Sequence, residues 1–321
     1  MLPYLVDVTL RLASGLDALP ESQRQLHAGY FRRLQRPDGG FAGREGESDL
    51  YYSGFALRGL ALLGQLTGDV ADQAGQFLLG HSEPEAAAVD RLSLVFGVSL
   101  LEMAAGVDLF GSRKSEWRQA TVQSLESLRR ADGGYAKATE GQASSTYHTF
   151  LIAVGLQLLD MPLVEPERMV DFVLSQQRDD GGFVEIRPMR RSGTNPTAAA
   201  IAILKIVDAL DNDVRTSVID FLSGMQTEEG GLRANTRIPI ADLLSTFTGA
   251  LTLADLGALD AINAQAAVKF TLALEQSAGG FRAAAWDESH DVEYTFYGLG
   301  TLGLFGGDRR LENDNRSDRS D

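Results

Sequence analysis

Arg36-Pro37-Asp38-Gly39-Gly40-Phe41 contains a short box, two glycines followed by an apolar residue, that recurs along the chain. It returns as Asp132-Gly133-Gly134-Tyr135, Asp180-Gly181-Gly182-Phe183, Glu229-Gly230-Gly231-Leu232 and Ala278-Gly279-Gly280-Phe281. The last three steps are 48, 49 and 49 residues long, and the first is 94. Because 94 is close to twice the period, we expect a sixth copy that has lost its glycines within about Leu79 to Asp90. A period of this length predicts an array of helical units that bury their faces against one another.

The unit around Asp180 shows the plan. Residues 167–177 place Met169 and Val173 on one face of a helix and charged side chains on the other, which predicts a half-exposed outer helix. The glycines turn the chain, and a second helix follows from Thr194. That helix is apolar nearly all round, so we expect it to be buried on most sides. The same plan predicts inner helices over 50–63, 92–103, 147–159, 243–253 and 294–304.

These units predict an all-α fold, an α/α toroid in which six outer helices surround six inner ones. An open solenoid is the alternative, and the apolar inner helices favour closure because an open concave face would expose them. We expect one domain over 1–307 and a disordered polar tail over 308–321.

Composition narrows the function. The 321 residues carry a net charge of −15 and no cysteine, which argues against a nucleic-acid surface and excludes thiolate metal ligands. The start, Met1 to Asp7, has neither the basic residues nor the apolar run of a signal peptide, and we expect a cytoplasmic protein without a membrane span.

The box and the inner-helix starts resemble the repeat of protein prenyltransferase β subunits and of squalene and oxidosqualene cyclases. The resemblance covers about residues 20–307 and rests on Arg36 to Phe41, Asp49 to Gly64, Tyr147 to Phe150 and Asp291 to Tyr297. It implies a central apolar funnel for an isoprenoid chain, with polar substrate groups at the N-termini of the inner helices. It also implies a helical partner subunit, which this chain does not contain.

Two positions depart from the family pattern. Prenyltransferase zinc is held by an aspartate and a cysteine two residues apart on the fifth inner helix and by a histidine on the sixth. Asp242 matches the aspartate, but Leu244 and Tyr294 stand at the other two positions. Leucine cannot bind zinc and neutral tyrosine binds it poorly, so the resemblance does not supply a thiolate-activating site. The acidic motif by which the triterpene cyclases protonate their substrate is also missing.

Arginines gather in the loops before three inner helices. Because guanidinium groups and helix N-termini both bind phosphate oxygens, we predict a diphosphate site there. Its members are Arg187, Arg190, Arg191, Arg233 and Arg237, and Arg282 lies in the third loop. The alternative is that these side chains are solvated or paired with carboxylates.

Aromatic side chains occupy the first turns of the inner helices and predict an apolar pocket for a prenyl tail or a carbocation. We expect substrate contacts from Tyr51, Tyr52, Tyr147, Tyr294 and Tyr297, together with Phe55, Phe150, Phe247 and Phe296. Ordinary core packing between the two helix layers is the alternative for each residue.

Ionisable residues at two neighbouring inner-helix starts suggest catalysis or an altered metal site. We expect Asp242, Asp291 and His148 as acid, base or metal-linked catalytic groups. Zinc or another divalent metal stays open as a cofactor, held by Asp242, His290 and Asp291 with Asp287 and Glu293 nearby. Helix capping explains the same carboxylates without a metal.

The leading functional prediction is a prenyltransferase that binds an isoprenyl diphosphate in the funnel and transfers its prenyl group. A toroid that binds an isoprenoid or a partner protein without catalysis is the second, and a diverged terpene cyclase is the third.

Overall fold

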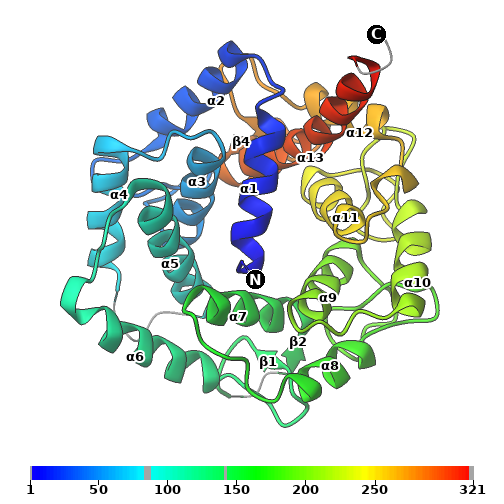
Figure 1. The fold of residues 1–321 in the computed structure, drawn as a ribbon, viewed down its shortest axis with the longest axis horizontal. Helices are drawn as coiled ribbons and strands as arrows, with labels where there is room; N and C mark the ends of the chain where they lie inside the picture. The colour runs from blue at the N-terminus through cyan, green and yellow to red at the C-terminus, as the bar shows by residue number, and fades with distance from the viewer. Residues whose placement is uncertain (1, 83–87, 141–142, 318–321) are drawn as a thin grey trace.

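The computed structural model describes residues 2–82, 88–140 and 143–317. Two concentric layers of helices form most of it (Figure 1). The outer helices are α2 (Glu21–Leu34), α4 (Gly68–Gly80), α6 (Lys114–Glu126), α8 (Pro166–Ser175), α10 (Asn212–Ser223) and α12 (Ala264–Ala273). The inner helices are α3 (Leu50–Leu62), α5 (Ala88–Leu100), α7 (Thr146–Leu158), α9 (Thr194–Ile206), α11 (Leu243–Asp255) and α13 (Val292–Ser317).

The ring is closed. Each inner helix packs against the next one along the chain, and α13 packs against α3, so the last unit meets the first. The α/α toroid predicted from the repeat is therefore confirmed. An open solenoid is excluded because its terminal inner helices would have no such contact.

The two glycines of each box make this packing. The first adopts a positive φ, +86° at Gly181, and an added Cβ there would lie 2.3 Å from the backbone oxygen of Ser217 on the next outer helix. The second lies beneath an aromatic ring of the same helix, Phe221 for Gly182. The box of the last unit, Gly279-Gly280, makes the equivalent contacts with Leu26 and Tyr30 of α2.

The residue after the glycines ties the box to its own inner helix. The backbone N–H of Phe183 donates to the Thr197 hydroxyl at 2.9 Å, while Asp180 accepts hydrogen bonds from Gly182 and Ser192. Equivalent bonds run from the apolar box residue to Ser53, Thr149, Thr246 and Thr295. Each repeat thus fixes the loop that leads to the N-terminus of its inner helix.

Short elements complete the fold. Strand β1 (Tyr135–Ala136) pairs antiparallel with β2 (Ser144–Ser145), and β3 (Phe281–Arg282) pairs with β4 (His290–Asp291). A π-helical turn, η1 (Leu101–Ala105), extends α5, and the 3₁₀ turns are η2 (Gly111–Arg113) and η3 (Leu259–Ala261).

A further helix, α1 (Tyr4–Leu16), crosses the centre of the ring (Figure 1). It packs against α13, α3 and α7. Its first residue is anchored at both ends: the Tyr4 amide donates to Gln157 at 3.0 Å and the Tyr4 hydroxyl donates to Asp255 at 2.6 Å. Because Gln157 and Asp255 lie in the last turns of α7 and α11, α1 closes the end of the ring where the inner helices finish.

The expected sixth box, within Leu79 to Asp90, overlaps 83–87, which lie outside the described residues. The division into 1–307 and a disordered tail stays a prediction, and 318–321 also lie outside the described residues. Across the part of the chain that the structure describes, no helix is long and apolar enough to cross a bilayer.

Candidate functional site

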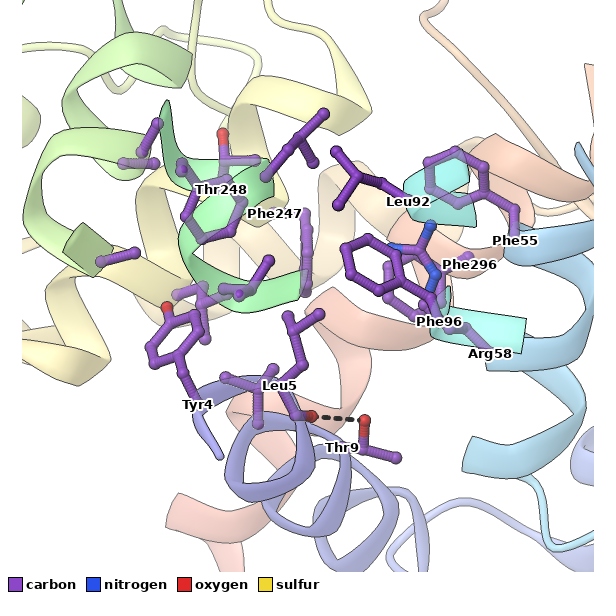
Figure 2. A pocket seen from close by; sticks show the side chains of 18 of the residues that line it. Tyr4, Leu5, Thr9, Phe55, Arg58, Leu92, Phe96, Phe247, Thr248 and Phe296 are labelled. Atoms are coloured by element: carbon purple, nitrogen blue, oxygen red, sulfur yellow. Dashed lines mark hydrogen bonds between the residues drawn. The ribbon is translucent and has the colours of Figure 1, made fainter. Parts of the chain in front are cut away.

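A cavity of about 530 Å³ occupies the middle of the ring. Its walls are the inner helices and its floor is α1, whose Tyr4, Leu5 and Thr9 face it (Figure 2). Side chains of the wall are mostly aliphatic or aromatic, including Leu92, Phe96, Val154 and Leu251. The volume lies within the range of about 300–1,000 Å³ that ligand pockets occupy.

The predicted aromatic lining is present in large part. Seven of the nine aromatic residues line the cavity: Tyr51, Phe55, Tyr147, Phe150, Phe247, Phe296 and Tyr297. Four of them form one cluster, in which the ring of Phe55 lies 5.7 Å from Phe296 and 5.4 Å from Tyr297, and Phe247 lies 5.6 Å from each. These rings present both faces and edges to a hydrocarbon ligand.

The other two tyrosines are outside the lining. Tyr52 covers Gly43, where an added Cβ would meet its ring at 2.5 Å. Tyr294 lies beneath the guanidinium of Arg44 at 5.7 Å, and burial raises the pKa of its hydroxyl to about 12. Both rings belong to the rim of the ring and not to the walls of the cavity.

Arg58 of α3 is the one cation among the lining residues (Figure 2). Its Nε donates to the backbone oxygen of Gly54 at 3.1 Å, and its guanidinium lies 4.2 Å from the ring of Phe55. Burial lowers the pKa of Arg58, and nearby Glu293 and three tyrosine hydroxyls act in the opposite direction. Aromatic faces therefore hold a positive charge at the wall of a mostly apolar cavity.

A buried carboxylate lies near this cation. Glu293, in the first turn of α13, accepts hydrogen bonds from the hydroxyls of Tyr51 at 2.9 Å and Tyr297 at 3.2 Å. Burial raises the pKa of Glu293, and the two tyrosine bonds and Arg58 lower it. Glu185 is a second carboxylate in the lining, and burial raises its pKa as well.

None of the five arginines predicted to bind diphosphate lines the cavity. Arg187, Arg190, Arg191 and Arg237 are exposed on the loops, and Arg187 borders a separate outer pocket with Arg130 and Asp132. Arg233 turns towards α10, where its Nη2 donates to the Gly224 oxygen at 3.0 Å. The structure therefore does not gather these side chains into one cluster at the cavity, and their role stays a prediction.

The predicted acidic groups have structural partners. Asp242 caps α11 by accepting from the amide and hydroxyl of Ser245 at 2.7 and 2.8 Å. Asp291 caps α13 through the Tyr294 amide and forms an ion pair with Arg44 at 3.0 Å. Asp287 pairs with the same arginine at 2.7 Å. Each carboxylate thus has a capping or ion-pair role.

The two predicted histidines lie apart from the cavity lining. Nδ1 of His148 bonds the Ser145 hydroxyl at 2.8 Å, and its buried Nε2 has no hydrogen-bond partner among the described residues. Burial lowers the pKa of His148. His290 is exposed on β4, with its ring 5.5 Å from that of Tyr30.

The resemblance to prenyltransferase β subunits implies zinc at these positions. Among the described residues, no group of three histidine, aspartate or glutamate side chains is arranged to hold a metal ion. Leu244 contributes an aliphatic side chain to the cavity, and Asp242 is engaged as a cap. The residues present therefore do not fit zinc, and no step below uses it.

Sequence reasoning missed Arg58 and α1. Arg58 is the only charged residue in the run Leu50 to Leu63, and a lone charge in an inner helix was a usable signal. α1 precedes the first box, so the repeat contained no information about it.

Comparison with known proteins agrees with this architecture. The family model of the prenyltransferase alpha-alpha toroid domain matches residues 4–88, 85–237 and 137–319. The geranylgeranyl transferase type-2 subunit beta of Saccharomyces cerevisiae is 31% identical over 141 residues, which is 43% of this chain and 43% of that protein. The protein farnesyltransferase subunit beta of Schizosaccharomyces pombe is 25% identical over 162 residues, 48% of this chain and 41% of that protein. The matches thus span less than half the length of these relatives.

Two solved structures show the same fold. A Candida albicans protein geranylgeranyltransferase-I, complexed with GGPP, superposes with a TM-score of 0.69 at 16% identity, covering 89% of this chain and 92% of that one. A type II terpene cyclase from Scytonema gives 0.62 at 13% identity, covering 94% and 99%. With the family model matched along almost the whole sequence, this chain belongs to the prenyltransferase alpha-alpha toroid family.

Proposed function

We propose that the protein binds an isoprenyl diphosphate with its hydrocarbon chain in the central cavity and transfers the prenyl group to an acceptor. The observation that carries this proposal is the mostly apolar cavity of about 530 Å³, lined by nine aromatic side chains. The relatives named as geranylgeranyl and farnesyl transferase subunits support the same ligand class.

For this reaction the protein has to bind the substrates and stabilise the charges that develop. The bond between C1 of the prenyl chain and the diphosphate oxygen breaks, and its electron pair leaves with the diphosphate. The allylic cation lies against aromatic faces such as Phe55 and Phe247, which stabilise positive charge. A nucleophilic atom of the acceptor then forms a bond with C1, and its proton passes to the released diphosphate or to solvent.

The second candidate function is binding of an isoprenyl diphosphate without catalysis. The residues at the family zinc positions, Leu244 and Tyr294, favour it because they offer no thiolate-activating metal. A single-turnover assay with radiolabelled geranylgeranyl diphosphate separates the two. An enzyme converts label to a prenylated product or releases diphosphate, whereas a binding protein returns intact diphosphate ester after denaturation. Failure to bind the label at all would overturn both, and a cyclised hydrocarbon would instead indicate a terpene cyclase.

We also propose that a partner subunit docks on the loops that precede the inner helices. Both curated relatives are named as beta subunits. Consecutive loops of this chain expose Met189, Ile238, Ile240 and Trp286, the last with 67% of its surface accessible. Exposed apolar side chains on neighbouring loops mark protein-binding surfaces. Replacing Trp286 and Ile240 with serine should abolish association with a co-expressed helical subunit, and an unchanged complex in size-exclusion chromatography would contradict this.

A further inference from the structure

We infer that the guanidinium of Arg58 binds an anionic oxygen group, a carboxylate or a phosphate, at the head of an amphipathic ligand inside the cavity. The inference rests on the proposed function for the hydrocarbon part of that ligand and adds the position of its polar end. It departs from the sequence prediction, which assigned anion binding to the exposed loop arginines.

Arg58 has N–H groups at the cavity wall that are not used in hydrogen bonds to the described residues. Its Nε is bonded to Gly54, but no hydrogen bond from Nη1 or Nη2 to the described residues is formed. No carboxylate of the described residues forms an ion pair with it either. A guanidinium has five N–H donors, so most of them remain available to a group that enters the cavity.

Without a ligand, the unpaired guanidinium of Arg58 costs folding free energy. Arg58 is half-buried at the cavity wall, and a charge that is partly removed from water is disfavoured unless it is paired. Around Arg58 the protein supplies aromatic faces, at 4.2 Å from Phe55, 5.1 Å from Phe296 and 5.8 Å from Phe96. Rings fix the position of the cation and stabilise it only partly, and they leave the edge of the guanidinium open. A site that is fixed and open in this way suits a bidentate oxygen anion.

The hydroxyl of Tyr147 is a second hydrogen-bond donor in the same cavity as Arg58. Burial, Glu293 and Glu185 raise the pKa of this hydroxyl, whereas the Arg58 guanidinium lowers it. No hydrogen bond from this hydroxyl to the described residues is formed, whereas the hydroxyls of Tyr51 and Tyr297 already donate to Glu293. Arg58 and Tyr147 therefore form a polar subsite for the head group of the ligand. The aliphatic walls and α1 surround the remainder.

The test compares ligands that differ only in the head group. Geranylgeranoic acid and geranylgeraniol form one pair, and dodecanoic acid and dodecanol form a second pair without isoprene units. In isothermal titration calorimetry, Arg58→Met should weaken binding of each acid tenfold or more and leave each alcohol within twofold. Methionine keeps the length and apolar body of the side chain. Arg168→Ala, an exposed arginine of the outer helix α8, is the control and should change neither member of a pair.

The outcomes are separable. Equal losses for acid and alcohol would show that Arg58→Met damages the cavity as a whole and would overturn the inference. The inference would also be overturned if Arg58→Met left the affinity for the acids unchanged. It would equally be overturned if neither acid bound to the wild type at 1 mM. Arg58-dependent binding of dodecanoate alone, without isoprenoids, would support the anion site and overturn the proposed function. Arg58→Lys keeps the charge and should retain part of the preference for acids.

A third ligand, geranylgeranyl diphosphate, distinguishes the two sources of the anion. If Arg58→Met weakens it as much as it weakens the acid, the diphosphate itself is the head group at Arg58. If the diphosphate depends on Arg191 and Arg237 while the acid depends on Arg58, a carboxylate is the head group inside the cavity.

Discussion

His27 and Gly280 are joined across the closure of the ring: the backbone N–H of Gly280 donates to Nδ1 of His27 at 3.2 Å. The other ring nitrogen, Nε2, lies 3.1 Å from the carboxylate of Glu275, and the imidazole stacks on Phe281 at 4.9 Å. Nδ1 must be unprotonated to accept this bond, so the closure needs a neutral imidazole. The first outer helix and the last box are therefore held together by a bond that protonation of His27 would break.

This contact predicts a dependence of stability on pH. Burial lowers the pKa of His27 below its usual 6.5, and Glu275 only partly opposes this effect. The unfolded chain then binds the proton more readily, so stability is fully present above about pH 6.5 and falls as the pH drops below it. The slope attributable to His27 is at most about 1.4 kcal/mol per pH unit.

Denaturant titrations between pH 5 and 8 check this expectation. His27→Gln retains an oxygen acceptor for Gly280 and an N–H donor for Glu275, so it should remove the part of the slope near pH 6 while keeping the fold. If the slopes of the wild type and His27→Gln coincide, the imidazole is not the titrating group.

The box glycines predict a second effect on stability. Gly181→Ala combines a positive φ with a Cβ at 2.3 Å from Ser217 O and should lower the free energy of unfolding by more than about 3 kcal/mol. Gly46 has φ +93° and nothing within 4 Å, so Gly46→Ala should cost only about 1 kcal/mol. Urea unfolding of both variants measures the difference. Similar losses would mean that the contact between units contributes little.

The repeat made the fold predictable. Glycine pairs at a constant period report the contacts between neighbouring units, and apolar runs report the inner layer. Closure was predictable as well, since six apolar helices have no other way to bury their faces. The helix α1 lies outside the periodic pattern, and no local feature of Tyr4 to Leu16 indicates that it enters the ring.

The site was less predictable because side-chain direction decides it. Tyr51 and Tyr52 are adjacent in the sequence, yet only Tyr51 lines the cavity. Similarly, the position of Arg233 in a loop before an inner helix predicts a diphosphate ligand, but the guanidinium donates to the Gly224 carbonyl. Repeat spacing places a residue at a helix start, but it does not say which way the side chain points.

The position of α1 predicts the chain-length preference of the cavity. Leu5 lies on the cavity floor and faces the cavity, so Leu5→Trp should fill the space that the far end of a long chain needs. We expect affinity for geranylgeranyl diphosphate to fall about tenfold more than affinity for geranyl diphosphate. Leu10 is 57% exposed on the same helix, and Leu10→Trp should change neither value. Equal losses for both ligands in Leu5→Trp would argue against α1 as the floor of the ligand site.

Restoring the family zinc ligands at Leu244 and Tyr294 should create a metal site. Asp242 is close enough to raise the pKa of Tyr294, so α11 and α13 bring these positions together. The double variant Leu244→Cys with Tyr294→His should therefore bind about one zinc per chain by elemental analysis. Leu251 lies two turns further along α11, and Leu251→Cys with Tyr294→His is the control that should bind none. If both double variants bind zinc equally, the match of this chain to the family zinc positions is wrong.

Photoaffinity labelling tests most directly the central claim that the closed ring holds a prenyl chain. A geranylgeranyl diphosphate analogue with a diazirine at the far end of its chain would be cross-linked and the labelled peptides identified by mass spectrometry. The account predicts labels on α1 and on the cavity-facing residues of α5, α7 and α11, and competition by unlabelled geranylgeranyl diphosphate. Labels confined to the outer helices, or labelling that does not compete, would contradict it.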